Sequence, residues 1–132
     1  GNHLATADDL LEILERVGAH PLLGVCWDVG HANISGYNQS EQMEILKGKI
    51  NVLHIHDNGG KGAKDAHLLP FEGAVNWEDV AEGMRRAEFS GILDVEVTAW
   101  ALSGDERTRA EFGGNVVRCA KRLLHMAEQK TL

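Results

Sequence analysis

The sequence predicts an α/β fold in which three parallel strands alternate with helices. Three short apolar runs rich in β-forming residues are separated by stretches with the apolar spacing of helices. The runs begin roughly 30 to 40 residues apart, which is the length of a strand–helix unit. Because strands joined through helices form right-handed crossovers, this order predicts a parallel sheet.

The first half of the chain contains the first of these strands. Thr6 is a good N-cap, so we expect a helix that begins after it and that Gly18 ends. The apolar run 22–27 then predicts a buried strand that leads to Asp28. Ser40 is expected to cap a shorter second helix.

The second half repeats the pattern twice. The run 50–55 predicts the second strand, and Asn76 is expected to cap the helix that follows its long glycine-rich loop. A third strand is predicted over 92–97. Ser103 and Glu106 have the spacing of a capping box, which predicts the start of the last helix.

Length and composition predict one modest globular domain over residues 1–132, with strand ends near 28, 54 and 96. The chain is 43% hydrophobic and 25% charged, and its net charge is −7. This acidic balance disfavours binding to nucleic acid or to an anionic membrane surface. No apolar run approaches the length that spans a membrane.

The two cysteines, Cys26 and Cys119, lie in apparent core segments. Two isolated cysteines do not make a disulfide framework. We therefore expect reduced, buried thiols, and a cytoplasmic protein.

Each predicted strand ends in side chains that can bind a metal. Asp28 ends the first strand, His54 ends the second and Glu96 ends the third. Because the carboxyl ends of parallel strands share one rim, we expect these three side chains to converge. Two carboxylates and one imidazole suit Mn²⁺, Mg²⁺, Co²⁺ or Zn²⁺.

Two choices stay open at this rim. Alternation along the strand puts His56 on the same side as His54, and only one of the two is expected to bind the ion directly. Asp94 lies on the same side as Glu96 and is the alternative carboxylate.

Five ordered motifs make the pattern more specific. They lie at 25–31 (VCWDVGH), 53–57 (LHIHD), 65–70 (DAHLLP), 73–77 (GAVNW) and 91–96 (GILDVE). Together they resemble the xylose isomerase-like TIM-barrel family, which contains sugar and sugar-phosphate isomerases and epimerases and is related to the apurinic endonucleases. The resemblance implies a (βα)₈ barrel of which this chain matches the C-terminal part.

The resemblance also implies roles for single residues. Asp28, His54 and Glu96 match ligands of a divalent metal. Glu96 and His31 are the expected catalytic residues, Glu96 for proton transfer and His31 beside a substrate oxygen. The residues expected to contact the substrate are His31, His56, Asp65 and His67.

The expected function is a divalent-metal-dependent isomerase or epimerase of a sugar or sugar phosphate. One alternative is metal-dependent phosphodiester hydrolysis of the apurinic endonuclease type, and another is a non-catalytic half-barrel. Phe71 stands where the family usually has glycine, and a further metal-binding glutamate usually stands where this chain begins Gly1-Asn2-His3. We therefore expect the chain alone to turn over little substrate. We also expect a homo-oligomer, or pairing with an N-terminal half-barrel.

Overall fold

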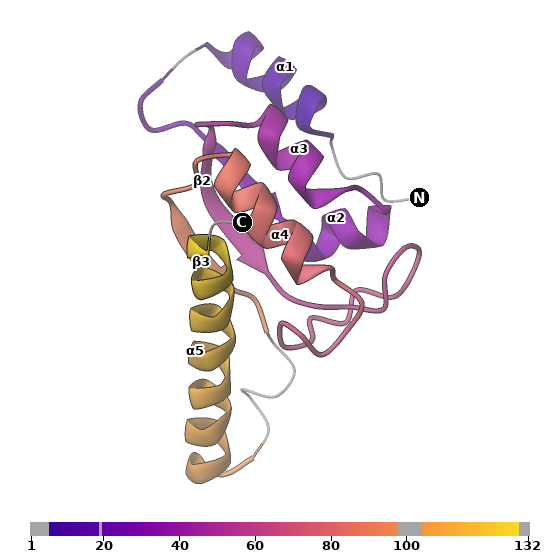
Figure 1. The fold of residues 1–132 in the computed structure, drawn as a ribbon, viewed down its shortest axis with the longest axis vertical. Coiled ribbons are helices and arrows are strands. Elements are labelled where there is room, and N and C mark those ends of the chain that lie inside the picture. The colour runs from indigo at the N-terminus through magenta and orange to yellow at the C-terminus, as the bar shows by residue number, and fades with distance from the viewer. Residues whose placement is uncertain (1–5, 19, 98–103, 130–132) are drawn as a thin grey trace.

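The computed structural model describes residues 6–18, 20–97 and 104–129. Helices and strands alternate along the chain, and the expected α/β architecture is confirmed (Figure 1). The elements are α1 (Ala7–Val17), β1 (Val25–Asp28), α2 (Val29–Ser35), α3 (Gln39–Ile45), β2 (Ile50–Ile55), α4 (Trp77–Arg86), β3 (Ile92–Val95) and α5 (Glu106–Glu128).

The three strands form a parallel sheet in the order β1-β2-β3. Asp28 is in register with His54, and His54 is in register with Asp94. An irregularity between Val25 and Cys26 shifts the register at the start of β1. The carboxyl ends of the strands therefore lie level with one another, which brings their polar side chains together.

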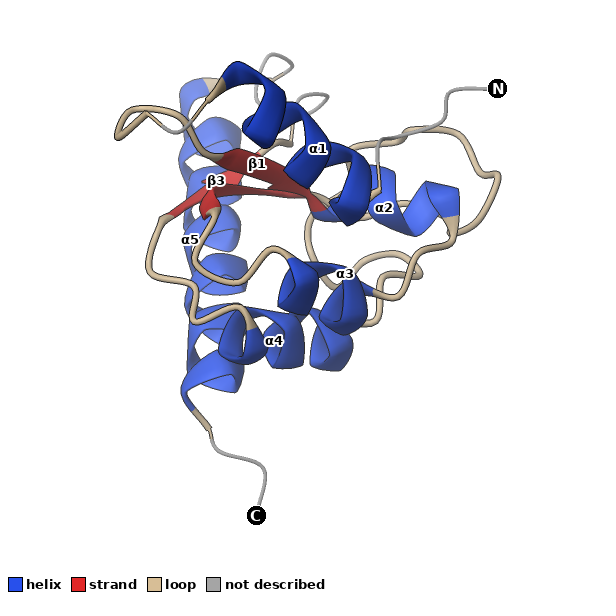
Figure 2. Cartoon of the chain, turned by 90° about the horizontal axis from the view of Figure 1, so that it is seen from above, coloured by secondary structure: helices blue, strands red, loops and turns tan. Residues whose placement is uncertain are grey.

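Helices α3 and α4 pack against each other and cover one face of the sheet (Figure 2). The sheet contributes Trp27, Leu53 and Ile55 to this core, all at most 1% exposed. Facing them, α3 contributes Met43, and Gly83 of α4 lies so close that a Cβ there would be 2.7 Å from the Met43 sulfur. Burial of these apolar side chains holds the helices on the sheet.

The opposite face of the sheet is more open. Cys26 is exposed on it, so the expectation of a buried thiol is wrong at this position, because alternation turns Cys26 away from the helices. Cys119, on α5, is half-buried. Ile92 of β3 is 66% exposed.

Two helix starts agree with the sequence. Thr6 caps α1 in a capping box with Asp9, and Gly18 ends the helix. The Asn76 side chain accepts a hydrogen bond from the backbone N–H of Asp79 and so caps α4. Short polar side chains at these positions satisfy backbone donors that the first helical turn leaves free.

Two other predicted caps are wrong. Helix α3 is capped by Asn38, which accepts from the N–H of Glu41 at 2.9 Å, and Ser40 lies inside the helix. Helix α5 is capped by Asp105, whereas Ser103 lies outside the described residues. In both cases another good capping side chain lies two residues from the predicted one.

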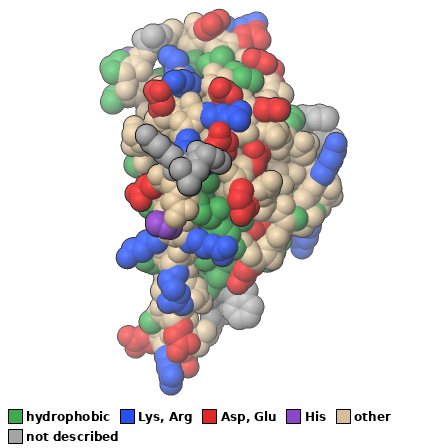
Figure 3. Space-filling view, viewed as in Figure 1, with side chains coloured by type: hydrophobic (Ala, Val, Ile, Leu, Met, Phe, Trp, Pro, Cys, Tyr) green, Lys and Arg blue, Asp and Glu red, His purple; other side chains and the backbone are tan. Residues whose placement is uncertain are grey.

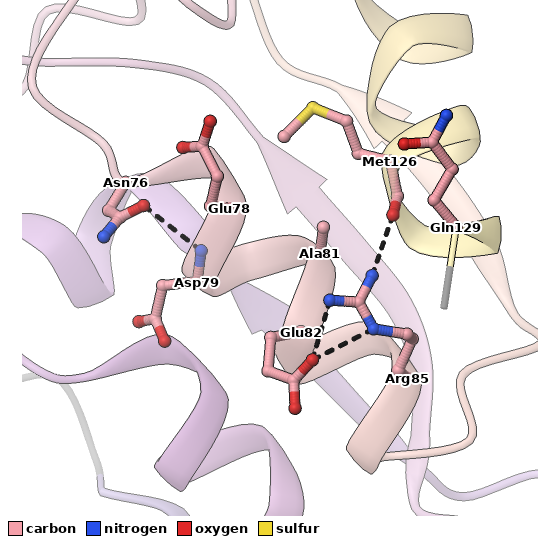
Figure 4. A pocket seen from close by; sticks show the side chains of 8 residues that line it. All are labelled: Asn76, Glu78, Asp79, Ala81, Glu82, Arg85, Met126 and Gln129. Carbon is pink, nitrogen blue, oxygen red and sulfur yellow. Dashed lines mark hydrogen bonds and ion pairs between the residues drawn. The ribbon is translucent and has the colours of Figure 1, made fainter. Parts of the chain in front are cut away.

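The contact between α4 and α5 leaves an open hollow of about 740 Å³ (Figure 4). Arg85 spans it, donating to the Met126 carbonyl at 2.7 Å and to Glu82. The lining belongs to the outer helical layer and includes none of the strand-end residues. Among the helices that the structure describes, none is long and apolar enough to cross a membrane.

Candidate active site

The three strand-end side chains converge, as the sequence predicts. Nδ1 of His54 lies 3.8 Å from Oδ2 of Asp28 and 3.5 Å from Oε2 of Glu96. Asp94, the alternative carboxylate, is also close, at 3.6 Å from Nε2 of His54. His54 therefore lies among three carboxylates. This is an arrangement that a cation would stabilise, because the carboxylates repel one another.

Asp28 also caps a helix, a role that the sequence analysis did not assign to it. Its Oδ1 accepts the backbone N–H of His31 at 2.8 Å and so caps α2, and Oδ2 lies 2.9 Å from Nδ1 of His31. Burial raises the pKa of the Asp28 carboxyl. Contacts with His56 and His31 outweigh this effect, and the pKa lies below its ordinary value. The carboxylate is thus ionised and oriented at neutral pH.

The loop after β2 is held by the buried carboxylate of Asp57. Its Oδ1 accepts the backbone N–H groups of Asn58 (2.9 Å) and Val75 (3.0 Å). Its Oδ2 accepts the N–H of Phe71 (3.1 Å) and Nε1–H of Trp77 (2.9 Å). These four bonds fold the loop back onto the strand ends, which brings residues 65–67 over the sheet.

Glycine is required where this loop crosses Asp57. A Cβ at Gly73 would lie 2.3 Å from the Asp57 carboxylate. Phe71 has φ of 76° and so adopts the left-handed conformation that glycine, which the resemblance leads us to expect here, favours. Its ring packs at 5.1 Å from Trp77 and beneath the Arg122 guanidinium, so the loop keeps its turn despite the substitution.

The loop brings a second group of ligating side chains to the strand ends. Oδ2 of Asp65 lies 3.0 Å from Nε2 of His31 and 3.1 Å from Nε2 of His67. Nδ1–H of His67 donates to the carbonyl of Glu96 at 2.8 Å. His67 has φ of 45°, an uncommon backbone conformation that these contacts maintain.

Contacts within this group shift the pKa values of Asp65 and His67 in opposite directions. Burial raises the pKa of Asp65, but the hydrogen bond from His31 and the charge of His67 outweigh it and lower the pKa. Burial lowers the pKa of His67, but the Glu96 carbonyl and Asp65 outweigh it and raise the pKa. Both shifts favour the charged forms.

His56 lies on the side of the sheet that strand alternation predicts, since its Nε2 is 3.2 Å from Oδ1 of Asp28. It was expected to contact substrate, but its side chain is fully buried, so substrate cannot reach it in this structure. The ring stacks on His67 with centroids 3.9 Å apart, and it packs against Gly30, where a Cβ would lie 2.0 Å from Cε1.

Two overlapping groups of side chains could hold a metal ion. One consists of Asp28, His56 and Glu96. The other consists of His31, His56, Asp65 and His67. The imidazole and carboxylate donors fit a divalent ion of the kind that the sequence predicts, and the buried His56 ring lacks a hydrogen-bond partner for either nitrogen among the described residues. Which of these residues bind a metal stays a prediction.

Comparison with known proteins identifies the family to which this fold belongs. A family model described as xylose isomerase-like TIM barrel matches residues 1–113. A curated relative, an uncharacterized protein of Methanocaldococcus jannaschii, is 34% identical over 92 residues, which are 69% of this chain and 31% of that protein. The chain thus spans about a third of the length of this relative.

Solved structures share the fold. A D-tagatose 3-epimerase-like protein superposes with a TM-score of 0.67 at 28% identity, covering 92% of this chain and 42% of that one. A xylose isomerase domain protein from Alicyclobacillus acidocaldarius superposes with a TM-score of 0.71 at 25% identity, covering 94% and 44%. The three strands described above therefore correspond to part of a larger barrel.

Proposed function

Because this chain belongs to the xylose isomerase-like TIM-barrel family, we propose that it carries part of the active site of a sugar or sugar-phosphate isomerase or epimerase that depends on a divalent metal. The observation that carries the proposal is the convergence of Asp28, His54 and Glu96 at the ends of three neighbouring strands. The epimerase-like protein among the structural neighbours supports the reaction class.

In this proposal Asp28, His54 and Glu96 hold the ion. A bound divalent cation would act as a Lewis acid on the carbonyl oxygen and the neighbouring hydroxyl oxygen of the substrate, and so acidify the C–H next to the carbonyl. The Glu96 side chain is 36% exposed, and its carboxylate accepts or returns the proton at that carbon. His31 is 39% exposed, with Asp28 at its Nδ1 and Asp65 at its Nε2. In this proposal a substrate oxygen replaces Asp65 as the acceptor of Nε2–H, while Asp28 fixes the ring through Nδ1.

The exposed part of the second group supplies the substrate contacts. Asp65 and His67, on the loop after β2, lie beside His31 of α2. Their side chains are 40% and 21% exposed. A carboxylate and two imidazoles can hydrogen-bond several hydroxyl groups of a sugar. Because the loop is fixed by the buried Asp57, these groups are already oriented before substrate arrives.

The proposal is tested by deuterium exchange into ketoses and ketose phosphates. The chain is assayed alone and fused behind the N-terminal half of a family barrel, with Mn²⁺, Mg²⁺, Co²⁺ or Zn²⁺ added. We expect metal-dependent exchange at the carbon next to the carbonyl in the fusion, and little in the chain alone. Glu96→Gln should abolish exchange, whereas Glu111→Gln, on the exposed surface of α5, should leave it unchanged. A fusion that binds the metal but exchanges no substrate would contradict the proposal.

One observation favours a second candidate, metal-dependent phosphodiester hydrolysis. His31, Asp65 and His67 place a second set of metal-ligating atoms beside the first, and adjacent ions are a common device for phosphodiester cleavage. The face shown in Figure 3 carries acidic and basic side chains intermixed, so its described residues present no continuous basic surface. Binding to abasic duplex DNA that weakens steeply with salt, followed by cleavage, would favour this candidate over the isomerase.

A further inference from the structure

His56 is the buried residue that the two groups of metal-ligating side chains share. Its side chain is fully buried, and neither ring nitrogen has a hydrogen-bond partner among the residues that the structure describes. Buried polar side chains nearly always have a partner, so two unsatisfied nitrogens on one buried ring need an explanation.

The two nitrogens face two carboxylates on opposite sides of the ring. Nε2 lies 3.2 Å from Oδ1 of Asp28, and Nδ1 lies 3.8 Å from Oδ1 of Asp65. A neutral imidazole carries one proton, so one nitrogen can donate to a carboxylate while the other presents a lone pair. A lone pair that faces a carboxylate is unfavourable unless a positive charge lies between them.

The distances indicate which nitrogen has which role. The 3.2 Å separation on the Asp28 side is close to a hydrogen-bond length, so the proton belongs on Nε2. The 3.8 Å separation on the Asp65 side is longer than a hydrogen bond. Two ligands at about 2.1 Å from one tetrahedral ion lie roughly 3.4 Å apart, so a small movement would admit a cation between Nδ1 and Asp65.

The ring cannot easily turn away from this position. Gly30 lies against one side, with no room for even a methyl group, and the His67 ring stacks on the ring at 3.9 Å. The neighbouring groups therefore fix the orientation of the imidazole before a cation binds, as a preorganised metal ligand requires.

We propose that His56 binds a divalent cation directly through Nδ1, together with the loop group His31, Asp65 and His67, while Nε2 holds the Asp28 carboxylate in place. The inference rests on the proposed metal dependence, and it places this cation on the side of the ring opposite Asp28. One side chain then connects the strand-end group to the loop group, so that cation binding also fixes Asp65.

The direct test is ¹⁵N NMR of the histidine rings during a titration of the 132-residue chain with Zn²⁺ alone. We expect the Nδ1 resonance of His56 to shift on saturation while Nε2 stays protonated. The rings of His20 and His125, which lie on exposed segments, should not shift. Zn²⁺ binding that shifts His54 but leaves both nitrogens of His56 unchanged would overturn the inference and leave the proposed function standing. If no histidine shifts and no Zn²⁺ binds, the proposed metal dependence fails as well.

A pair of variants tests the same point by affinity. His56→Phe keeps a ring of similar shape but removes both nitrogens, and His125→Phe is its exposed control. We expect His56→Phe to weaken Zn²⁺ binding about 10- to 100-fold. The metal-free variant should unfold at a lower temperature than the unaltered chain, because Asp28 loses its contact with Nε2, so the affinities are compared below the unfolding transition. Unchanged Zn²⁺ affinity in a folded His56→Phe chain would overturn the proposal, and if that variant does not fold, the NMR titration decides.

Discussion

Oδ2 of Asp28 lies 3.8 Å from Nδ1 of His54, across the neighbouring parallel strands β1 and β2. The two residues are in register, so backbone pairing fixes the distance between their side chains. Asp28 also caps α2 through the N–H of His31. The Asp28 carboxylate is thus both a helix cap and a candidate metal ligand, and mutation can separate the two roles.

Asp28→Asn separates them, because asparagine caps a helix about as well as aspartate but is a weaker metal ligand. We expect divalent-metal affinity to fall at least about 10-fold. The unfolding free energy of the metal-free chain should fall by about 1–2 kcal/mol, because the cap remains but the contacts with His31 and His56 lose the carboxylate charge. Asp28→Ala should also lose the cap and cost about 1 kcal/mol more. Calorimetric titration with Zn²⁺ or Mn²⁺ and denaturant unfolding in chelator measure the two effects, and unchanged affinity in Asp28→Asn would show that Asp28 is not a ligand.

Asp57 is expected to be the most sensitive polar residue for stability. Each of its oxygens accepts two hydrogen bonds, so Asp57→Asn would turn one oxygen into a donor facing two donors. The loss should be about 2–4 kcal/mol of unfolding free energy. Asp8→Asn, at an exposed position in α1, should change stability by less than about 0.5 kcal/mol. Equal effects of the two substitutions in urea unfolding would contradict this role for Asp57.

Two glycine-to-alanine substitutions should have opposite effects. Gly30→Ala places a methyl group 2.0 Å from Cε1 of His56, and because that ring is buried we expect a loss of about 2–3 kcal/mol. Gly113→Ala meets nothing within 4 Å inside α5 and should stabilise the chain by about 0.5–1 kcal/mol. Thermal unfolding compares them, and a harmless Gly30→Ala would mean that the His56 ring is free to move.

The rim of the sheet could be predicted because it depends on local signals. Each strand is an apolar run that ends in a polar residue, and parallel pairing then requires Asp28 and His54 to be neighbours. Helix α2 was missed because Asp28 and His31, at its start, were assigned only to the site and not to a helix cap. Its signal was the spacing of Asp28 and His31, which is that of a capping side chain and the N–H it accepts.

The burial of His56 could not be predicted from local pattern. Strand alternation gives the side of the sheet on which His56 lies, but it does not say whether other segments cover the ring. Its ring position depends on Gly30, which is 26 positions earlier in the chain, and on the loop that Asp57 folds. The sequence predicts which side chains gather at the rim, but long-range contacts decide which of them is covered.

The last prediction concerns the open side of the sheet. Strands β1 and β3 are the outer strands of the described sheet, and Ile92 is 66% exposed on β3, on the same side as Asp94 and His54. Outer strands with exposed apolar side chains tend to pair with another chain. We therefore expect this chain to self-associate at micromolar concentration, or to bind an N-terminal half-barrel in preference when one is supplied. Ile92→Lys should weaken self-association by placing a charge at the sheet edge. Val117→Lys, at a site 52% exposed on α5, should not. Sedimentation velocity over a dilution series measures the difference, and a monomer at all concentrations, or equal effects of the two substitutions, would show that the open sheet does not drive association.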